Sequence, residues 1–222
     1  MRAGHAEPVV RVRRIAAKSV ELLEPADPEW GPVAPETLAL APTPILSQPS
    51  VYVQAAWKDK PYGAVKNLDV QAAHNGESIF FRLSWSDASK DDAISDTDAF
   101  ADAAAVLFPE KGDAPLTSMG SPDQPVFAWL WRPDLEEPYR INAQGIGSSQ
   151  RLPANGITAK AEHTGAGWRL VISRRLSGKG AGLLLAPGAK GKVAFAVWQG
   201  ADKERGGLKA VTLEWQQLDI EA

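Results

Sequence analysis

The sequence contains one methionine besides Met1, and its position raises a chemical question. Met119 lies in the turn-forming stretch Ser-Met-Gly-Ser-Pro, shortly before an apolar run that holds Trp129 and Trp131. A methionine beside tryptophans can simply pack, because its flexible thioether fills irregular gaps. Its sulfur can also act as a soft metal ligand. The residues around Met119 leave both interpretations open.

Other residue types exclude several kinds of site. The absence of cysteine excludes disulfides, thiolate-bound metals, iron–sulfur ligation and haem attached covalently through Cys-x-x-Cys-His. The histidines, His5, His74 and His163, form no pair at metal-ligand spacing, and we expect each to be exposed to solvent. The acidic run 87–102 resembles a calcium-binding loop only loosely, so we interpret it as a solvated loop that faces a partner.

Charge and hydropathy exclude two classes of partner. The net charge is −3 with a pI near 5.7, and apart from a short basic patch at 11–14 the charges are mixed. We therefore expect no nucleic-acid partner. No run approaches the roughly 18 apolar residues of a membrane-spanning helix. The N-terminus lacks an apolar signal core, so we expect either a cytoplasmic protein or one whose signal has been removed.

Strand patterns dominate the chain. Ile79, Phe81, Leu83 and Trp85 should share one buried face, because they occupy alternate positions and the polar Ser78, Arg82 and Ser84 lie on the other face. The Asn-Gly pair at 75–76 precedes this run and predicts a hairpin. Further predicted strands are 51–57, 64–73, 104–108, 125–131, 157–163, 167–173, 193–198 and 208–215. The run 193–198 is apolar on both faces, which is typical of a central strand.

Few segments favour other structure. The proline-rich segment 24–49 should run extended over the surface rather than within a central sheet. Segment 177–192 is rich in glycine and lysine and predicts a mobile loop, and a helical turn or two is expected only near 91–101. Many short strands with regular turn signals predict an all-β fold, an antiparallel β-sandwich with few short helices and long loops. We expect residues 1–222 to form a single domain.

Three passages together resemble a known family. They are 100–109 (FADAAAVLFP), Met119-Gly120 followed by the strand-like run at 125–131, and 195–201 (FAVWQGA) followed by 204–209 (ERGGLK). Their order resembles the haem b-binding γ subunits of ethylbenzene dehydrogenase, dimethylsulfide dehydrogenase, selenate reductase and chlorate reductase. Residues 83–87 and the stretch 22–40 around Trp30 are also similar to that family.

The resemblance implies a non-covalent haem b within the β-sandwich, held by an axial methionine and lysine. In this chain these ligands would be Met119 and Lys209, with Lys203 as the alternative lysine. Leu208 precedes Lys209 where the family often has arginine. Expected pocket walls are Val126, Phe127, Trp129 and Trp198. Expected partners for the haem propionates are Arg132, Arg140, Arg151 and Arg205, and spacing does not choose among them.

A lysine ligand is chemically reasonable although it must be neutral. A free lysine has a pKa of about 10.4, so removing its proton at pH 7 costs about 4.6 kcal/mol. Burial against aromatic walls disfavours the ammonium and reduces this cost. With both axial positions filled by the protein, a substrate cannot reach the iron. The implied role is therefore electron transfer without catalysis.

By resemblance, the protein would be the γ subunit of an oxidoreductase complex in the periplasm. It would relay electrons between a molybdopterin catalytic subunit with its iron–sulfur subunit and an external cytochrome or other carrier. Two alternatives remain open at this point. One is a stand-alone haem b carrier or redox sensor, and the other is a non-catalytic carbohydrate-binding β-sandwich whose tryptophans stack on sugar rings.

Overall fold

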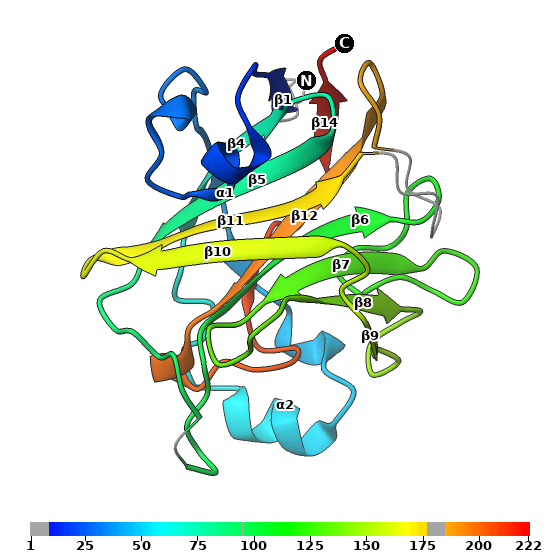
Figure 1. Ribbon diagram of the computed structural model, residues 1–222. Helices are drawn as coiled ribbons and strands as arrows, with labels where there is room; N and C mark the ends of the chain where they lie inside the picture. The colour runs from blue at the N-terminus through cyan, green and yellow to red at the C-terminus, as the bar shows by residue number, and fades with distance from the viewer. Residues whose placement is uncertain (1–8, 95, 177–184) are drawn as a thin grey trace, which may run out of the picture.

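The computed structural model describes residues 9–94, 96–176 and 185–222, and Figure 1 shows an all-β sandwich with few short helices. His5 and residues 177–184 of the predicted loop lie outside this part of the chain. The strands are β1 (Val9–Arg14), β2 (Glu36–Ala39), β3 (Ala41–Pro42), β4 (Asn67–His74), β5 (Ser78–Ser86), β6 (Ala103–Pro109), β7 (Val126–Trp131), β8 (Tyr139–Ala143), β9 (Gln150–Leu152), β10 (Ile157–His163), β11 (Gly167–Arg175), β12 (Lys190–Trp198), β13 (Ala210–Val211) and β14 (Gln216–Ile220). The helices are α1 (Ser19–Leu23), α2 (Val51–Trp57) and the 3-10 turns η1 (Pro28–Trp30), η2 (Ile45–Ser47) and η3 (Gly200–Asp202).

Strand β12 belongs to both layers of the sandwich. Its first half, Lys190–Val193, pairs with β14, and its second half, Ala194–Trp198, pairs with β6. The first sheet has the order β10-β11-β5-β4-β1-β14, and the second continues through β12 as β6-β7-β8-β9. Most pairings are antiparallel, as predicted, but β1 runs parallel to both β4 and β14. Figure 1 shows β1 and β14 side by side near the two chain ends.

The main core lies between the two sheets and is built from the predicted alternation. Ile79, Phe81, Leu83 and Trp85 of β5 are all buried in it, which confirms the predicted face. The hairpin between β4 and β5 is also confirmed, with Gly76 at a φ of 88° that glycine adopts without strain. Strand β12 is covered on both faces, as its unbroken apolar run predicted.

A second apolar layer covers the outer face of the second sheet. It contains Ala103, Ala105 and Leu107 of β6 together with Ala128 and Leu130 of β7. Their neighbours in sequence, such as Ala104, Val106 and Trp129, point the other way into the main core. The second sheet therefore has two buried faces. The outer one carries the candidate site described below.

Several sequence-based expectations are wrong. Residues 51–57 form α2 instead of a strand: Ser50 caps the helix by accepting from the Val53 N–H at 3.4 Å, and none of the residues of α2 is buried. The predicted strand 208–215 is only the two-residue β13, and pairing resumes in β14. No helix occurs among the described residues of 91–101. The proline-rich segment 24–49 was expected to stay out of a central sheet, but its β2 pairs with β4 of the first sheet and its β3 pairs with β13. Leu38 and Leu40 of this segment are buried in the main core, because the segment lies beside the strands with which it pairs.

Two expected surface groups are buried. His74 has no exposed area, and its Nε2 lies 3.0 Å from the Glu221 carbonyl oxygen, where the chain termini pack together. Within the acidic run, Asp87 and Asp102 are also buried rather than solvated. Asp102 accepts hydrogen bonds from the Trp168 indole and from the Gly200 N–H, both at 2.9 Å. These side chains therefore have structural partners that the local sequence did not reveal.

Candidate cofactor site

Met119 occupies a tight turn whose backbone fixes its position. Its φ is 58°, which is uncommon for a residue with a side chain. The Met119 N–H donates to the Leu116 carbonyl at 2.9 Å, and its own carbonyl accepts from Gly145 at 3.0 Å. A Cβ on Gly120 would lie only 2.8 Å from the Gln124 carbonyl, so only glycine fits after Met119. These contacts direct the thioether toward the outer face of the second sheet.

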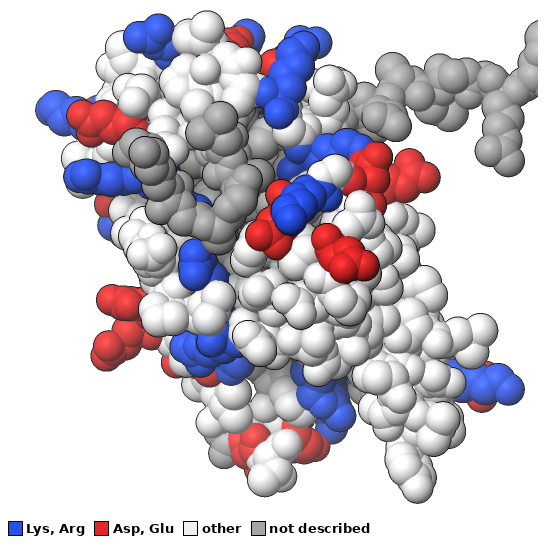
Figure 2. All heavy atoms as spheres, turned by 90° about the vertical axis from the view of Figure 1, so that its right-hand side faces the viewer, with Lys and Arg blue, Asp and Glu red and all other residues white. Residues whose placement is uncertain are grey.

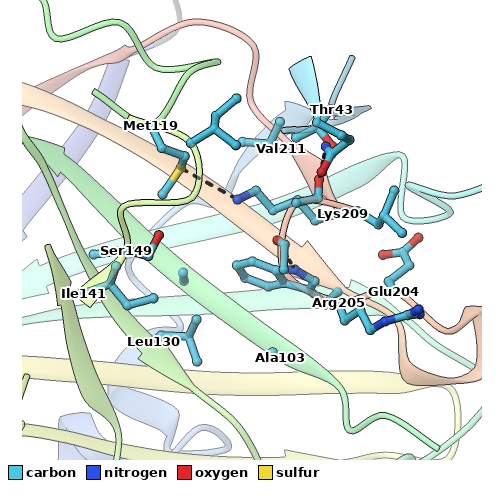
Figure 3. A pocket seen from close by; sticks show the side chains of 18 of the residues that line it. Thr43, Ala103, Met119, Leu130, Ile141, Ser149, Glu204, Arg205, Lys209 and Val211 are labelled. Atoms are coloured by element: carbon cyan, nitrogen blue, oxygen red, sulfur yellow. Dashed lines mark hydrogen bonds between the residues drawn. The ribbon is translucent and has the colours of Figure 1, made fainter. Parts of the chain in front are cut away.

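Lys209 reaches Met119 from a distant part of the chain. It precedes β13, is 5% exposed, and its carbonyl accepts from the Thr43 N–H at 3.1 Å. The Lys209 Nζ lies 3.7 Å from the Met119 Sδ, and Figure 3 shows the two side chains pointing at each other. The same Nζ lies 4.9 Å from the centre of the Trp198 ring.

The surroundings of Lys209 lower the pKa of its amine and so make the neutral form easier to reach. Burial lowers the pKa of the amine from 10.5 to about 8, because the ammonium loses its hydration. No carboxylate lies within ion-pair distance of the amine in the described part of the chain. A neutral amine is a ligand, whereas an ammonium is only a hydrogen-bond donor. The site thus brings a thioether and a readily deprotonated amine together.

Both side chains line a cavity of about 680 Å³. This volume is within the usual range for small-molecule and cofactor sites. Its floor is the outer face of the second sheet, seen behind the pair in Figure 3. The apolar floor residues are Ala103, Ala105 and Leu107 of β6, Ala128 and Leu130 of β7, Tyr139 and Ile141 of β8, and Val211 of β13. Alanines at three of these positions leave the room that a larger residue would fill.

Polar groups lie around the apolar floor. Thr43, Gln48 and Ser149 line the cavity, and so do two arginines. Arg132 is already engaged by Asp134, with N–O distances of 2.8 and 2.6 Å. Arg205 has no carboxylate partner in the described part of the chain, and its guanidinium lies 4.4 Å from the centre of the Phe100 ring. Arg205 is therefore the lining arginine whose charge is available to an anionic group.

The cavity brings together five of the residues singled out from the sequence: Met119, Lys209, Trp198, Arg132 and Arg205. Arg140, Arg151 and three of the expected wall residues do not line it. Trp129 points into the main core and packs against Phe108, with ring centres 4.8 Å apart. Phe127 alternates with Ala128 and so faces the same way as Trp129. Val126 is buried on the outer face but outside the cavity.

The alternative lysine lies elsewhere. Lys203 Nζ pairs with Asp98 at 2.7 Å on the surface, and the residue does not line the cavity. The cavity also lies on the outer face of the second sheet rather than between the sheets, where the sandwich interior is closely filled by large apolar side chains. Thr43 and Gln48 were missed by sequence reasoning. They come from the proline-rich segment, which carries no periodic pattern that indicates their direction.

The residues present fit a haem with two protein ligands. A thioether and an amine lie 3.7 Å apart in the lining of an apolar cavity, which is also lined by Arg205, an arginine without a carboxylate partner in the described part of the chain. The described chain contains no group of three or more His, Cys, Asp or Glu side chains arranged to hold a metal ion. The candidate donors are a thioether and an amine, unlike the carboxylate sets that hold Mg²⁺ or Ca²⁺.

The chain is an all-β sandwich that carries a cavity lined by Met119 and Lys209 on one outer face. The comparison with protein families then specifies its family: the model for the family described as ethylbenzene dehydrogenase matches residues 27–158. The chain belongs to this family. None of the helices that the structure describes is long and apolar enough to cross a membrane.

Individual relatives carry names of the same kind. The chlorate reductase subunit gamma of Ideonella dechloratans is 40% identical over 157 residues, which are 70% of this chain and 65% of that protein. The dimethylsulfide dehydrogenase subunit gamma of Rhodovulum sulfidophilum is 37% identical over 68% of this chain and 59% of its own length. A protein of Haloferax mediterranei named as a putative respiratory nitrate reductase haem subunit is 33% identical over 83% of this chain and 67% of its own length. The matched region thus spans about two thirds of these relatives or less.

Solved structures share the fold at low sequence identity. A protein of Bacteroides uniformis described as carbohydrate-binding superposes with a TM-score of 0.58 at 12% identity, covering 97% of this chain and all of that one. A family 9 carbohydrate-binding module of Caldicellulosiruptor kristjanssonii in complex with glucose superposes with a TM-score of 0.51 at 10% identity, and the match covers 96% of each chain. At such identities these similarities describe the sandwich fold alone.

Proposed function

We propose that this protein is a haem b electron-transfer subunit in which Met119 and Lys209 are the axial ligands. The observation that carries the proposal is the 3.7 Å approach of the Met119 Sδ to the Lys209 Nζ in the lining of one cavity. A surface lysine and a packing methionine would have no reason to meet there. The names of the relatives, which include a haem subunit and two γ subunits of oxidoreductases, support the same role.

When bound, a haem supplies a reversible one-electron centre, and the residues of this chain determine how it is used. Met119, a neutral soft ligand, favours the ferrous state and raises the reduction potential. Lys209 would supply the second protein ligand, which would leave no place on the iron for a substrate. The apolar floor excludes water from the cofactor. Arg205 is the proposed partner of a propionate, because its guanidinium is not held by a carboxylate.

We infer the partners from the relatives. The chain would act as the γ subunit beside a molybdopterin catalytic subunit and an iron–sulfur subunit, and it would exchange electrons with an external periplasmic cytochrome or other carrier. A stand-alone haem b carrier would share the site, so the subunit composition of the native protein separates the two. A sugar-binding role is less well supported, because it gives no reason for a buried lysine to face Met119.

The ligand assignment predicts a specific spectrum. The haem-loaded protein should be low-spin and should not bind carbon monoxide at neutral pH, because both axial positions are filled. Met119→Ala and Lys209→Ala should each abolish the low-spin signature, and Met119→Ala should also lower the reduction potential. The measurements are visible absorption, electron paramagnetic resonance and a redox titration.

Lys203→Ala is the matched control for this experiment. Its amine belongs to a surface ion pair with Asp98, so its loss should leave the spectrum unchanged. An unaltered low-spin spectrum in Lys209→Ala, or a spectrum that changes with Lys203 instead, would refute the assignment.

A further inference from the structure

Glu204 is a buried carboxylate that the electron-transfer proposal leaves without a role. It is 1% exposed and has no cationic partner in the described part of the chain. Its carboxylate instead accepts from three backbone N–H groups, those of Gly63, Ala64 at 3.1 Å and Gln199 at 3.0 Å. Burial raises the pKa of this carboxyl group, and the three hydrogen bonds oppose that rise. The three hydrogen bonds therefore tie Glu204 to the neighbouring backbone segments.

The three donors come from two segments that enclose the loop leading to Lys209. Gln199 follows β12, and Gly63 and Ala64 precede β4. Gly63 packs so closely that an added Cβ would lie 2.7 Å from the Cα of Pro42, and Pro42 pairs with Ala210, the residue after Lys209. Glu204 therefore ties the start of the 203–209 loop to residues 63–64. Gly63 also packs against Pro42, which pairs with Ala210 at the end of the loop.

The rest of the loop is attached at several other points. Two glycines follow Arg205, and Gly206 has a φ of 55°. The Gly207 carbonyl accepts from the Gln48 side chain at 3.0 Å and from the Thr43 hydroxyl, and the Trp198 indole donates to the Gly206 carbonyl at 3.0 Å. Glycines resist bending little, so the shape of the loop depends on these attachments together with that of Glu204.

The amine at the end of this loop gains from leaving the cavity. The Lys209 amine is buried against the Trp198 ring and the Met119 sulfur, and water would solvate the amine better than these two groups do. A lysine with a flexible side chain will reach solvent whenever its backbone allows it. The fastened loop is what prevents this.

We propose that Glu204 is a positioning residue that holds the 203–209 loop and so keeps the Lys209 amine opposite Met119. The inference about amine placement concerns the protein without haem. Its consequence for the haem spectrum rests on the proposed function.

The test compares Glu204→Gln with Asp202→Asn. Gln is nearly the same size as Glu but turns an NH₂ group toward backbone donors, whereas Asp202 is an exposed carboxylate at the start of the same loop. In the haem-free protein, competitive acetylation followed by mass spectrometry measures how accessible the Lys209 amine is. Glu204→Gln should raise the acetylation rate of Lys209 by roughly tenfold or more, as expected from the loss of one charge-assisted hydrogen bond. Asp202→Asn should leave it within about twofold of the unchanged protein, because it breaks no such bond.

A second readout uses the haem-loaded protein. Glu204→Gln should lower the low-spin fraction, and Glu204→Asp, which keeps the charge, should restore part of it. Circular dichroism and thermal melting check that each variant is folded; if Glu204→Gln is not, the acetylation of Glu204→Asp decides. A folded variant whose Lys209 stays as protected as in the unchanged protein overturns the proposal. If Lys209→Ala leaves the spectrum unaltered, the ligand assignment fails, and the acetylation result still decides the role of Glu204.

Discussion

Lys209 differs from the other described lysines in what surrounds its amine. Lys203, Lys160 and Lys192, for example, each meet a carboxylate at the surface. Lys209 instead meets a thioether and an indole ring inside a cavity. Such a group lowers the stability of the haem-free protein, because its charged form is poorly solvated. This cost can be measured.

Lys209→Met should stabilise the haem-free protein in a pH-dependent way. The pKa of Lys209 is about 8 in the folded chain and 10.5 when it is exposed, so between these values the unfolded chain binds more protons. The free energy of unfolding of the unchanged protein therefore rises through this pH range. The variant lacks the titration, so its advantage at pH 7 should shrink by on the order of 3 kcal/mol by pH 10.5. Urea unfolding at several pH values measures it.

The control for this prediction is Lys203→Met, which removes an exposed amine and should show no such pH-dependent gain. Parallel stability curves for the unchanged protein and Lys209→Met would contradict the burial of the amine.

At the scale of elements, the cavity depends on small side chains along one face of β6. Ala103 and Ala105 point outward, while Ala104 and Val106 point into the main core. The space above the alanines is the cavity itself. A larger residue at an outward position would therefore fill the cavity without disturbing the core.

Ala105→Phe should block the cofactor while preserving the fold. The aromatic ring can occupy the cavity, so the melting temperature of the haem-free protein should change by only a few degrees or less. Haem affinity should fall by more than roughly tenfold, because the ring and the macrocycle compete for one space. Haem titration followed by absorbance measures it. Ala105→Ser is the control and should bind normally, and normal binding by Ala105→Phe would place the cofactor elsewhere.

The sequence predicts elements well where one face is buried and the other polar. The alternation of Ile79 to Trp85 predicted β5 and its face correctly. Residues 51–57 were wrongly predicted as a strand because the segment is apolar. Its apolar side chains, Val51 and Tyr52 among them, are in fact exposed on a surface helix, so burial does not impose a pattern that distinguishes helix from strand. Strand β1 was missed because its parallel partners lie far away along the chain.

The candidate site was only partly predictable, for a similar reason. Met119 and Lys209 were found through the resemblance of whole passages, since a lone lysine has no distinguishing local pattern. Predicting walls from proximity to Met119 selected Trp129, which faces the core, and overlooked Ala128, which faces the cavity. Side chains of β7 alternate between the main core and the outer apolar layer, and both are buried. The sequence of such a strand is apolar throughout, so it does not indicate which residues point to which layer.

At the scale of the whole molecule, Asp102 connects the two sheets at one end of the sandwich. It accepts from the indole of Trp168 in β11 of the first sheet, from Gly200 after β12, and from the Asp91 N–H at 3.0 Å. Burial, together with the nearby Asp87 carboxylate, raises the pKa of Asp102 to about 6. Keeping the Asp102 carboxylate ionised therefore lowers the free energy of unfolding.

The cost of ionising Asp102 predicts an unusual dependence of stability on pH. The folded pKa lies above the value of 3.8 for an exposed aspartate, so the folded chain binds more protons between pH 4 and 6. Relative to Asp102→Asn, the unchanged protein should lose stability as the pH rises through this range and stay level above it. Urea unfolding of both proteins at pH 4, 5, 6 and 7 measures the difference. A constant difference would show that Asp102 keeps an ordinary pKa.

Because the cavity lies outside the filled space between the sheets, the proposed haem would not be part of what holds the two layers together. On the proposed function, the chain would fold first and receive its porphyrin afterwards through the outer face. Maturation would then be a loading step on a finished scaffold. Cells short of iron would accumulate a folded, colourless protein rather than a collapsed one.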